Sequence, residues 1–349
     1  MRIVITHRHT GCQVKGGSVR TLVVALCIGV GALVAVDRPA AQQAAPGPAD
    51  PAVVPAAVRA ANARFAGVWR LVSEETRDAS GRIVPGGPNG SDGGRFGYIV
   101  YDPVGYMSVN LAWRDQPPFM GPTPTPQQAA TALARYNSYW GSFAVNEATG
   151  IVTHQTFGAV SPGFSGTNQE RRFSFDGNRL TLRPPTAANG DQRALTWERV
   201  PDLATLTPMH RRLIGIWKLV SFERRTAKGE VRSSYPGQTG FIVYTASGHV
   251  MVHMMQPYRR RFVGPSPTPD ETLATYRSYT SYFGEYTVHE REGYVVHHIA
   301  STFNSGAIGT DFQRFVELSG RRLTLRAPVT RDAAGEEIHP MIVWERLSD

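Results

Sequence analysis

The chain has 349 residues and a formal net charge of +9, from 37 lysines and arginines against 28 acidic residues. Five of the basic residues lie in the first 41 positions, so the remainder is only weakly basic. Because it has neither a helix-turn-helix pattern nor an aromatic-plus-basic RNA-binding pattern, nucleic acid is not an expected partner.

The N-terminal segment has the features of a secretory signal peptide. Residues 21–36 form an apolar run that follows Arg20 and leads to small residues. The run is shorter than the roughly 20 apolar residues that span a bilayer. Residues 1–41 are therefore expected to be a cleaved signal peptide of a periplasmic or secreted protein that keeps no membrane span, with an uncleaved anchor as the alternative.

Cys12 and Cys27 both lie in this expected signal peptide, so disulfides and thiolate catalysis are excluded from the mature chain. Residues 42–56 are rich in alanine, proline and glutamine and are expected to form a flexible linker.

The rest of the chain repeats itself. The segment Gly67-Val-Trp69-Arg-Leu-Val-Ser73 returns as Gly215-Ile-Trp217-Lys-Leu-Val-Ser221, and each copy closes on Trp-Glu-Arg. A repeat of this length marks domains rather than solenoid turns. Two domains are therefore predicted, over residues 57–200 and 205–349.

Each copy reads mainly as strands. In the first copy these are expected at 68–74, 97–101, 105–112, 142–146, 151–157, 170–175, 179–183 and 193–199. Alternation is clearest in the third strand, where Met107, Val109 and Leu111 share one face; in the second copy Val250, Val252 and Met254 do the same, opposite His249, Met251 and His253. Eight strands joined by short antiparallel turns favour a closed up-and-down barrel.

One short helix is expected to interrupt the strands of each copy. Thr125-Pro126 and Thr268-Pro269 are N-terminal capping signals. The helix is expected to carry Tyr136, Tyr139 and Trp140, matched by Tyr279, Tyr282 and Phe283, and to end at Gly141 and Gly284. The predicted fold is therefore all-β: two tandem eight-stranded antiparallel barrels, each with one short helix at the rim.

A tryptophan on the first strand and an arginine on the last strand resemble the pair found in the lipocalins and the wider calycin group. The resemblance implies that Trp69 meets Arg199 and Trp217 meets Arg346 at one barrel end, in a cation–π stack of about 0.5–2 kcal/mol. The ordered set of motifs, present twice, resembles the bacterial lipocalin-like domain family over about 57–349. Tandem proteins of this kind also include enzymes, similar to carotenoid hydratases and pericyclic cyclases.

The candidate ligand-binding residues are aromatic or titratable side chains, most of them matched between the copies. They are Tyr101, Tyr139, His154, Tyr244, His249, His253, Tyr282 and His297. His154 and His297 could act in a cavity as hydrogen-bond partners or proton shuttles. Ordinary core packing is the alternative for the tyrosines.

For the charged or titratable candidates, a solvated surface is the alternative to a binding site. His249 and His253 lie on the same side of one strand and with His297 could supply three imidazoles, but no acidic ligand is evident at a suitable spacing. No metal is therefore expected, and a solvated polar face is the alternative. Arg259–Arg261 and the matched Arg171 and Arg314 could attract an anionic ligand group such as a carboxylate.

These features predict an exported protein that binds a small hydrophobic molecule in a barrel cavity. The alternatives are a cofactor-free isomerase, hydratase or cyclase, and a filled-barrel interaction module. No serine nucleophile elbow, Walker loop or dinucleotide-binding turn is present, and no cofactor is expected. The second barrel, richer in histidine and arginine, is preferred as the functional one, and the sequence leaves the oligomeric state open.

Overall fold

The computed structural model describes residues 56–84, 94–119, 123–332 and 334–347. The predicted signal peptide, and the linker apart from Ala56, lie outside the described residues. In the part of the chain that is described, no helix is long and apolar enough to cross a membrane.

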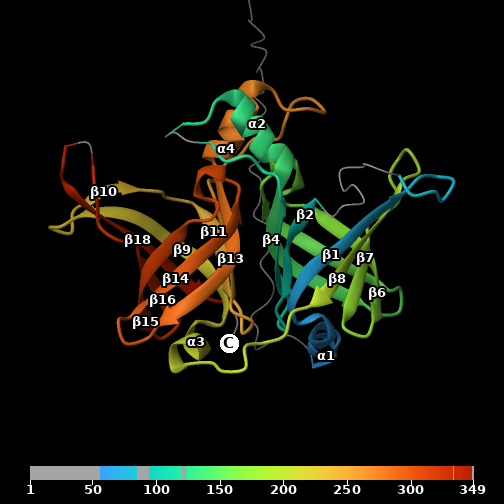
Figure 1. Ribbon diagram of the computed structural model, residues 1–349, viewed down its shortest axis with the longest axis horizontal. Coiled ribbons are helices and arrows are strands. Elements are labelled where there is room, and N and C mark those ends of the chain that lie inside the picture. The colour runs from blue at the N-terminus through green and yellow to red at the C-terminus, as the bar shows by residue number, and fades with distance from the viewer. Residues whose placement is uncertain (1–55, 85–93, 120–122, 333, 348–349) are drawn as a thin grey trace, which may run out of the picture. The chain divides into compact units, whose positions relative to one another are not determined.

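The first barrel follows a short helix and consists of eight antiparallel strands (Figure 1). The elements are α1 (Ala56–Phe65), β1 (Gly67–Arg77), β2 (Arg95–Tyr101), β3 (Tyr106–Trp113), α2 (Pro126–Arg135), β4 (Tyr136–Asn146), β5 (Ile151–Ala159), β6 (Asn168–Asp176), β7 (Arg179–Arg183) and β8 (Gln192–Arg199). Strands β1 and β8 pair with each other and close the barrel.

The second barrel repeats this plan after the helix that Thr207 and Pro208 begin. Its elements are α3 (Pro208–Leu213), β9 (Gly215–Thr226), β11 (Thr239–Tyr244), β12 (His249–Met255), α4 (Pro269–Arg277), β13 (Tyr279–His289), β14 (Tyr294–Thr302), β15 (Asp311–Ser319), β16 (Arg322–Arg326) and β18 (Glu337–Arg346). Pairing of β9 with β18 closes the barrel. Two further short strands pair with these closing strands, β10 (Val231–Ser234) with β9 and β17 (Thr330–Arg331) with β18. The prediction of two eight-stranded antiparallel barrels is confirmed.

The predicted helices begin where expected but are shorter. Thr125 and Thr268 each form a capping box with a proline in the first turn. The helices end before Tyr136 and Tyr279, however, and the aromatic residues that follow belong to strands β4 and β13. The placement of Tyr139 and Tyr282 on a helix is therefore wrong, because pairing of β4 and β13 with strands on both sides overrides the local pattern.

Gly141 and Gly284 do not end helices. Each lies in a strand beside a register shift, where a Cβ atom would come within 2.0 Å of Gln155 O or 1.8 Å of His298 O. Only glycine permits this close approach of the neighbouring strand.

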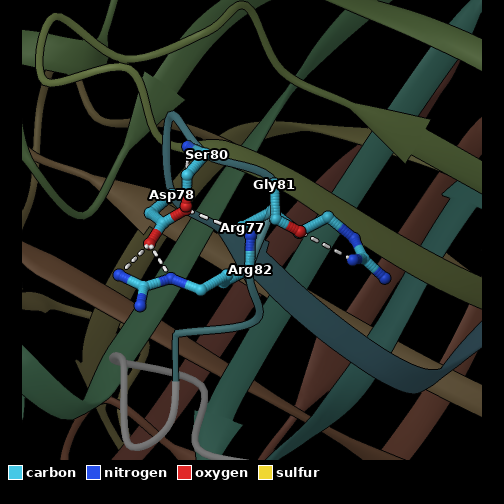
Figure 2. Close-up of polar contacts among 5 residues, drawn as sticks. All are labelled: Arg77, Asp78, Ser80, Gly81 and Arg82. Atoms are coloured by element: carbon cyan, nitrogen blue, oxygen red, sulfur yellow. Dashed lines mark hydrogen bonds and ion pairs between the residues drawn. The ribbon is translucent and has the colours of Figure 1, made fainter.

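The turn after β1 is held by local hydrogen bonds (Figure 2). Asp78 Oδ1 accepts hydrogen bonds from the backbone N–H groups of Ser80 at 2.9 Å and Arg82 at 3.0 Å, while Arg77 donates to Gly81 O at 2.9 Å. Gly81 has a φ of 83°, which glycine adopts without steric cost. The turn after β9 uses the same bond, from Arg225 to Gly229 O at 2.9 Å.

One end of each barrel is closed by the expected tryptophan and arginine. Arg199 Cζ lies 4.1 Å from the ring centroid of Trp69, and Arg346 Cζ lies 4.0 Å from that of Trp217. Both arginines also donate to carbonyls near the end of the helix that precedes their barrel, as Arg346 does to Ile214 O at 2.7 Å. The pair therefore fixes the entry helix as well as the barrel end.

The third strand of each barrel alternates as predicted, so that one face of the strand lies inside the barrel and the other outside it. Met107, Val109 and Leu111 belong to the core of the first barrel, and Val250 and Val252 to that of the second. The opposite faces do not meet solvent. Instead they pack together in a third apolar cluster that contains residues of both barrels, among them Tyr106 and Met251.

Candidate functional site

Each barrel encloses a buried histidine between two tyrosine hydroxyls. In the first barrel, Tyr101 OH lies 2.8 Å from His154 Nε2, and Tyr139 OH lies 3.0 Å from Nδ1. In the second barrel, Tyr244 OH and Tyr282 OH lie 2.7 Å and 2.9 Å from the same atoms of His297. The structure thus unites six of the eight candidate residues, in two matching sets.

Burial determines the charge of these sets. It holds the pKa of His154 and His297 well below the usual value, and it raises the pKa of the tyrosines. A neutral imidazole has one donor and one acceptor nitrogen, so one tyrosine of each set donates to the ring and the other accepts. The arrangement is a neutral, hydrogen-bonded chain across the barrel.

An arginine on the neighbouring strand completes each set. Arg171 lies beside Tyr139, and Arg314 lies beside Tyr282, where each opposes the burial-driven rise in the tyrosine pKa. Arg314 Cζ also lies 5.0 Å from the ring centroid of Phe312, and its Nη1 donates to Gln313 O at 2.8 Å. The sequence repeat alone had singled out this pair of arginines as matched.

The second barrel has a cavity of about 210 Å³ that reaches this arginine. Tyr282 and Arg314 are among its lining residues. Its other walls are mainly apolar and include Phe222, Ile242, Val252, Met254, Phe312, Leu325, Pro340, Ile342 and Trp344. A mostly apolar cavity with a few polar groups is the usual composition of a small-molecule site, although this one is smaller than most.

The first barrel has charged residues in the corresponding place. Glu74, with 4 % of its side chain exposed, forms an ion pair with Arg95 at 3.3 Å and a second one with Arg193. At the matching positions the second barrel has Phe222, Gln238 and Pro340. A separate hollow of about 390 Å³ is lined by Arg95, Arg193 and residues near α2, but its described lining does not include the first barrel's tyrosine–histidine set.

The ion cluster at Glu74 was missed from the sequence. Its three members lie on three different strands, β1, β2 and β8, so no local spacing links them. The only available signal was the mismatch between the copies, because the second copy has Phe222, Gln238 and Pro340 at these positions.

His249 and His253 lie outside the second barrel's interior. His253 is completely buried, with Nε2 2.6 Å from Ser108 Oγ and Nδ1 2.9 Å from Ser138 Oγ, both in the first barrel. The His249 ring packs on Tyr98, with 4.4 Å between ring centroids. The solvated polar face considered for them is therefore wrong, and they do not share a site with His297, which lies inside the barrel.

Burial lowers the pKa of His253 to about 3, so the histidine is a neutral part of the contact between the barrels. In the described part of the chain, no group of three or more histidine, cysteine, aspartate or glutamate side chains is placed to hold a metal ion.

Of the arginines in the loop before α4, Arg259 is a structural contact. It donates to Val160 O at 2.6 Å and to Ser278 Oγ at 3.0 Å, and its Cζ lies 5.1 Å from the Tyr279 ring centroid. Its guanidinium therefore connects the two halves of the chain, while Arg260 and Arg261 are exposed.

The model of the lipocalin-like domain family matches residues 66–200 and again residues 214–347. The chain belongs to this family, with one family domain for each barrel.

Solved structures show only distant similarity. A protein of unknown function from Nostoc punctiforme is 10% identical with a TM-score of 0.22, covering 83% of this chain and 98% of its own. A transferrin binding protein B from Haemophilus parasuis is 7% identical with a TM-score of 0.20, covering 80% and 76%. Among curated proteins, none matches the chain.

Proposed function

We propose that the protein binds a small, largely apolar molecule inside its second barrel. The observation that carries the proposal is the cavity of about 210 Å³, whose mainly apolar walls also include Tyr282 and Arg314. Apolar surface that is removed from water on binding contributes about 25 cal/mol per Å². A buried tyrosine hydroxyl and a guanidinium then orient the ligand.

The test is native mass spectrometry of the protein, purified without detergent and titrated with octanol as an apolar probe. The variant Val252→Phe places extra volume in the cavity wall, and Val109→Phe makes the same change at the matching position of the first barrel. The probe should bind the wild-type protein and Val109→Phe with one-to-one stoichiometry, but not Val252→Phe. Circular dichroism establishes that both variants are folded, and equal binding to all three proteins would contradict the proposal.

Export is part of the same proposal and rests on the apolar run at residues 21–36. Cell fractionation and N-terminal sequencing test it. We expect an extracytoplasmic chain that begins near residue 42, and a cytoplasmic chain with an intact N-terminus would refute export.

A cofactor-free isomerase, hydratase or cyclase is the second candidate, because the cavity wall includes Tyr282, which is bonded to His297. Such a chain could move a proton to or from a bound substrate. However, the first barrel contains the same tyrosine–histidine set beside the ion cluster at Glu74. The presence of the set in both barrels favours a structural role for it. His297→Ala should abolish turnover if the protein is an enzyme and only weaken binding if it is a carrier.

A further inference from the structure

Arg314 is a half-buried cation in the wall of the second barrel's cavity. Its contacts are a backbone carbonyl, the face of Phe312 and the hydroxyl of Tyr282. Among the residues that the structure describes, no carboxylate forms an ion pair with it. A cation in an apolar wall is costly unless a counter-charge and hydrogen bonds compensate the loss of water.

The two barrels differ in the charge of their interiors. In the first barrel the carboxylate of Glu74 forms ion pairs with Arg95 and Arg193. In the second barrel Phe222 replaces Glu74 and forms part of the cavity wall. The second barrel lacks this acid together with both of its arginine partners, which are replaced by Gln238 and Pro340, and it keeps Arg314 in the wall of the cavity.

We propose that the ligand of the second barrel is a small amphiphile whose carboxylate binds Arg314 and Tyr282. This inference rests on the proposed function and adds the chemical class of the ligand. A guanidinium presents its donors in a planar fork that matches a carboxylate, and the tyrosine hydroxyl adds a further donor. The apolar part of the ligand lies along Val252, Leu325 and Ile342.

The size of the cavity limits this class. About 210 Å³ is below the range of roughly 300–1,000 Å³ that is usual for drug-sized ligands. A medium-chain acid fits this limit, whereas a sterol or a long polyene does not. Octanoate is therefore a suitable probe, and octanol is its uncharged counterpart.

The experiment is isothermal titration calorimetry with octanoate and with octanol, on the wild-type protein and two variants. Arg314→Met removes the charge and keeps the length of the side chain, and Arg171→Met is the matched control in the first barrel. We expect Arg314→Met to weaken octanoate binding about 10- to 100-fold, as the loss of charge-assisted hydrogen bonds predicts, and to change octanol binding less than about 2-fold. Arg171→Met should leave both affinities unchanged.

The outcomes separate this inference from the function on which it rests. If Arg314→Met weakens the two probes equally or neither of them, the carboxylate inference is overturned and an apolar cavity remains. If neither probe binds the wild-type protein, the proposed function fails and the inference fails with it. Arg314→Lys keeps the charge without the fork and should give an octanoate affinity between those of the wild-type protein and Arg314→Met, provided near-ultraviolet circular dichroism shows a native fold.

Discussion

Glu74 and Phe222 occupy matching positions in the first strands of the two barrels, and they give the barrel interiors different chemistry. Glu74 in β1 is the pairing partner of Leu195 in β8, and Phe222 in β9 is the pairing partner of Ile342 in β18. The carboxylate holds two arginines in the first barrel, whereas the phenyl ring forms part of a cavity in the second. This difference, together with those between Arg95 and Gln238 and between Arg193 and Pro340, gives the first barrel a charged interior and the second a more apolar one.

Removing the first barrel's carboxylate should be strongly destabilising. Glu74→Ala leaves Arg95, with 11 % of its side chain exposed, without this counter-charge. Breaking a buried pair costs about 3–5 kcal/mol, and the lower end is expected because water screens the more exposed Arg193. Urea unfolding measures the loss. Glu75→Ala removes an exposed ion pair with Arg77 and should cost less than about 1 kcal/mol; equal losses would mean that the cluster is not stabilising.

The barrel-end arginine should not be replaceable by lysine. Arg346→Lys removes the planar stack on Trp217 and the hydrogen bond to Ile214 O. We expect a loss of about 1–3 kcal/mol in the free energy of unfolding, since both interactions require the guanidinium. Thermal denaturation provides the measurement. The exposed Arg322 is the control position, where Arg322→Lys should stay within about 0.5 kcal/mol. A wild-type melting curve for Arg346→Lys would refute the role of the stack.

Ser138 makes several of the hydrogen bonds between the barrels. Ser138 Oγ lies within 3.0 Å of His253 Nδ1, Tyr279 OH and Ser281 Oγ, and all four residues are buried. Ser138→Ala leaves some of these groups without a partner and should cost about 1–3 kcal/mol. Differential scanning calorimetry should show a lower transition temperature for this variant than for Ser234→Ala, which changes an exposed serine. Indistinguishable transitions would show that the polar contact does not hold the barrels together.

Acid should unfold the protein in a definite pH range. In the unfolded chain His253 binds a proton as the pH falls below about 6.5, but in the folded chain its pKa is about 3. The unfolded state therefore binds more protons between these values, and stability that is complete above pH 6.5 is lost as the pH falls toward 3. The loss is about 1.4 kcal/mol per pH unit for each such histidine, and burial acts in the same direction on His154 and His297.

Chemical denaturation at a series of pH values measures this slope. His253→Gln should reduce it by the contribution of one histidine. A free energy of unfolding that stays constant from pH 7 to about 4 would contradict the assignment of neutral, buried imidazoles.

The sequence by itself determined the duplicated barrel framework. The repeat, the capping signals at Thr125 and Thr268, and the alternation around Val109 are local patterns, and each is confirmed. The stacks of Trp69 on Arg199 and of Trp217 on Arg346 were also predicted, because they belong to a recognised arrangement of first and last strands.

The tertiary structure decided where the polar residues act. Alternation shows that His253 and Val252 lie on opposite faces, but not that the face with His253 packs on a second barrel. Local pattern likewise placed Tyr139 on a helix, whereas pairing with β3 and β5 holds it in a strand beside His154. Strand pairing and barrel closure join residues that are far apart in the chain. No local residue spacing indicates such contacts, so the sequence alone could not predict them.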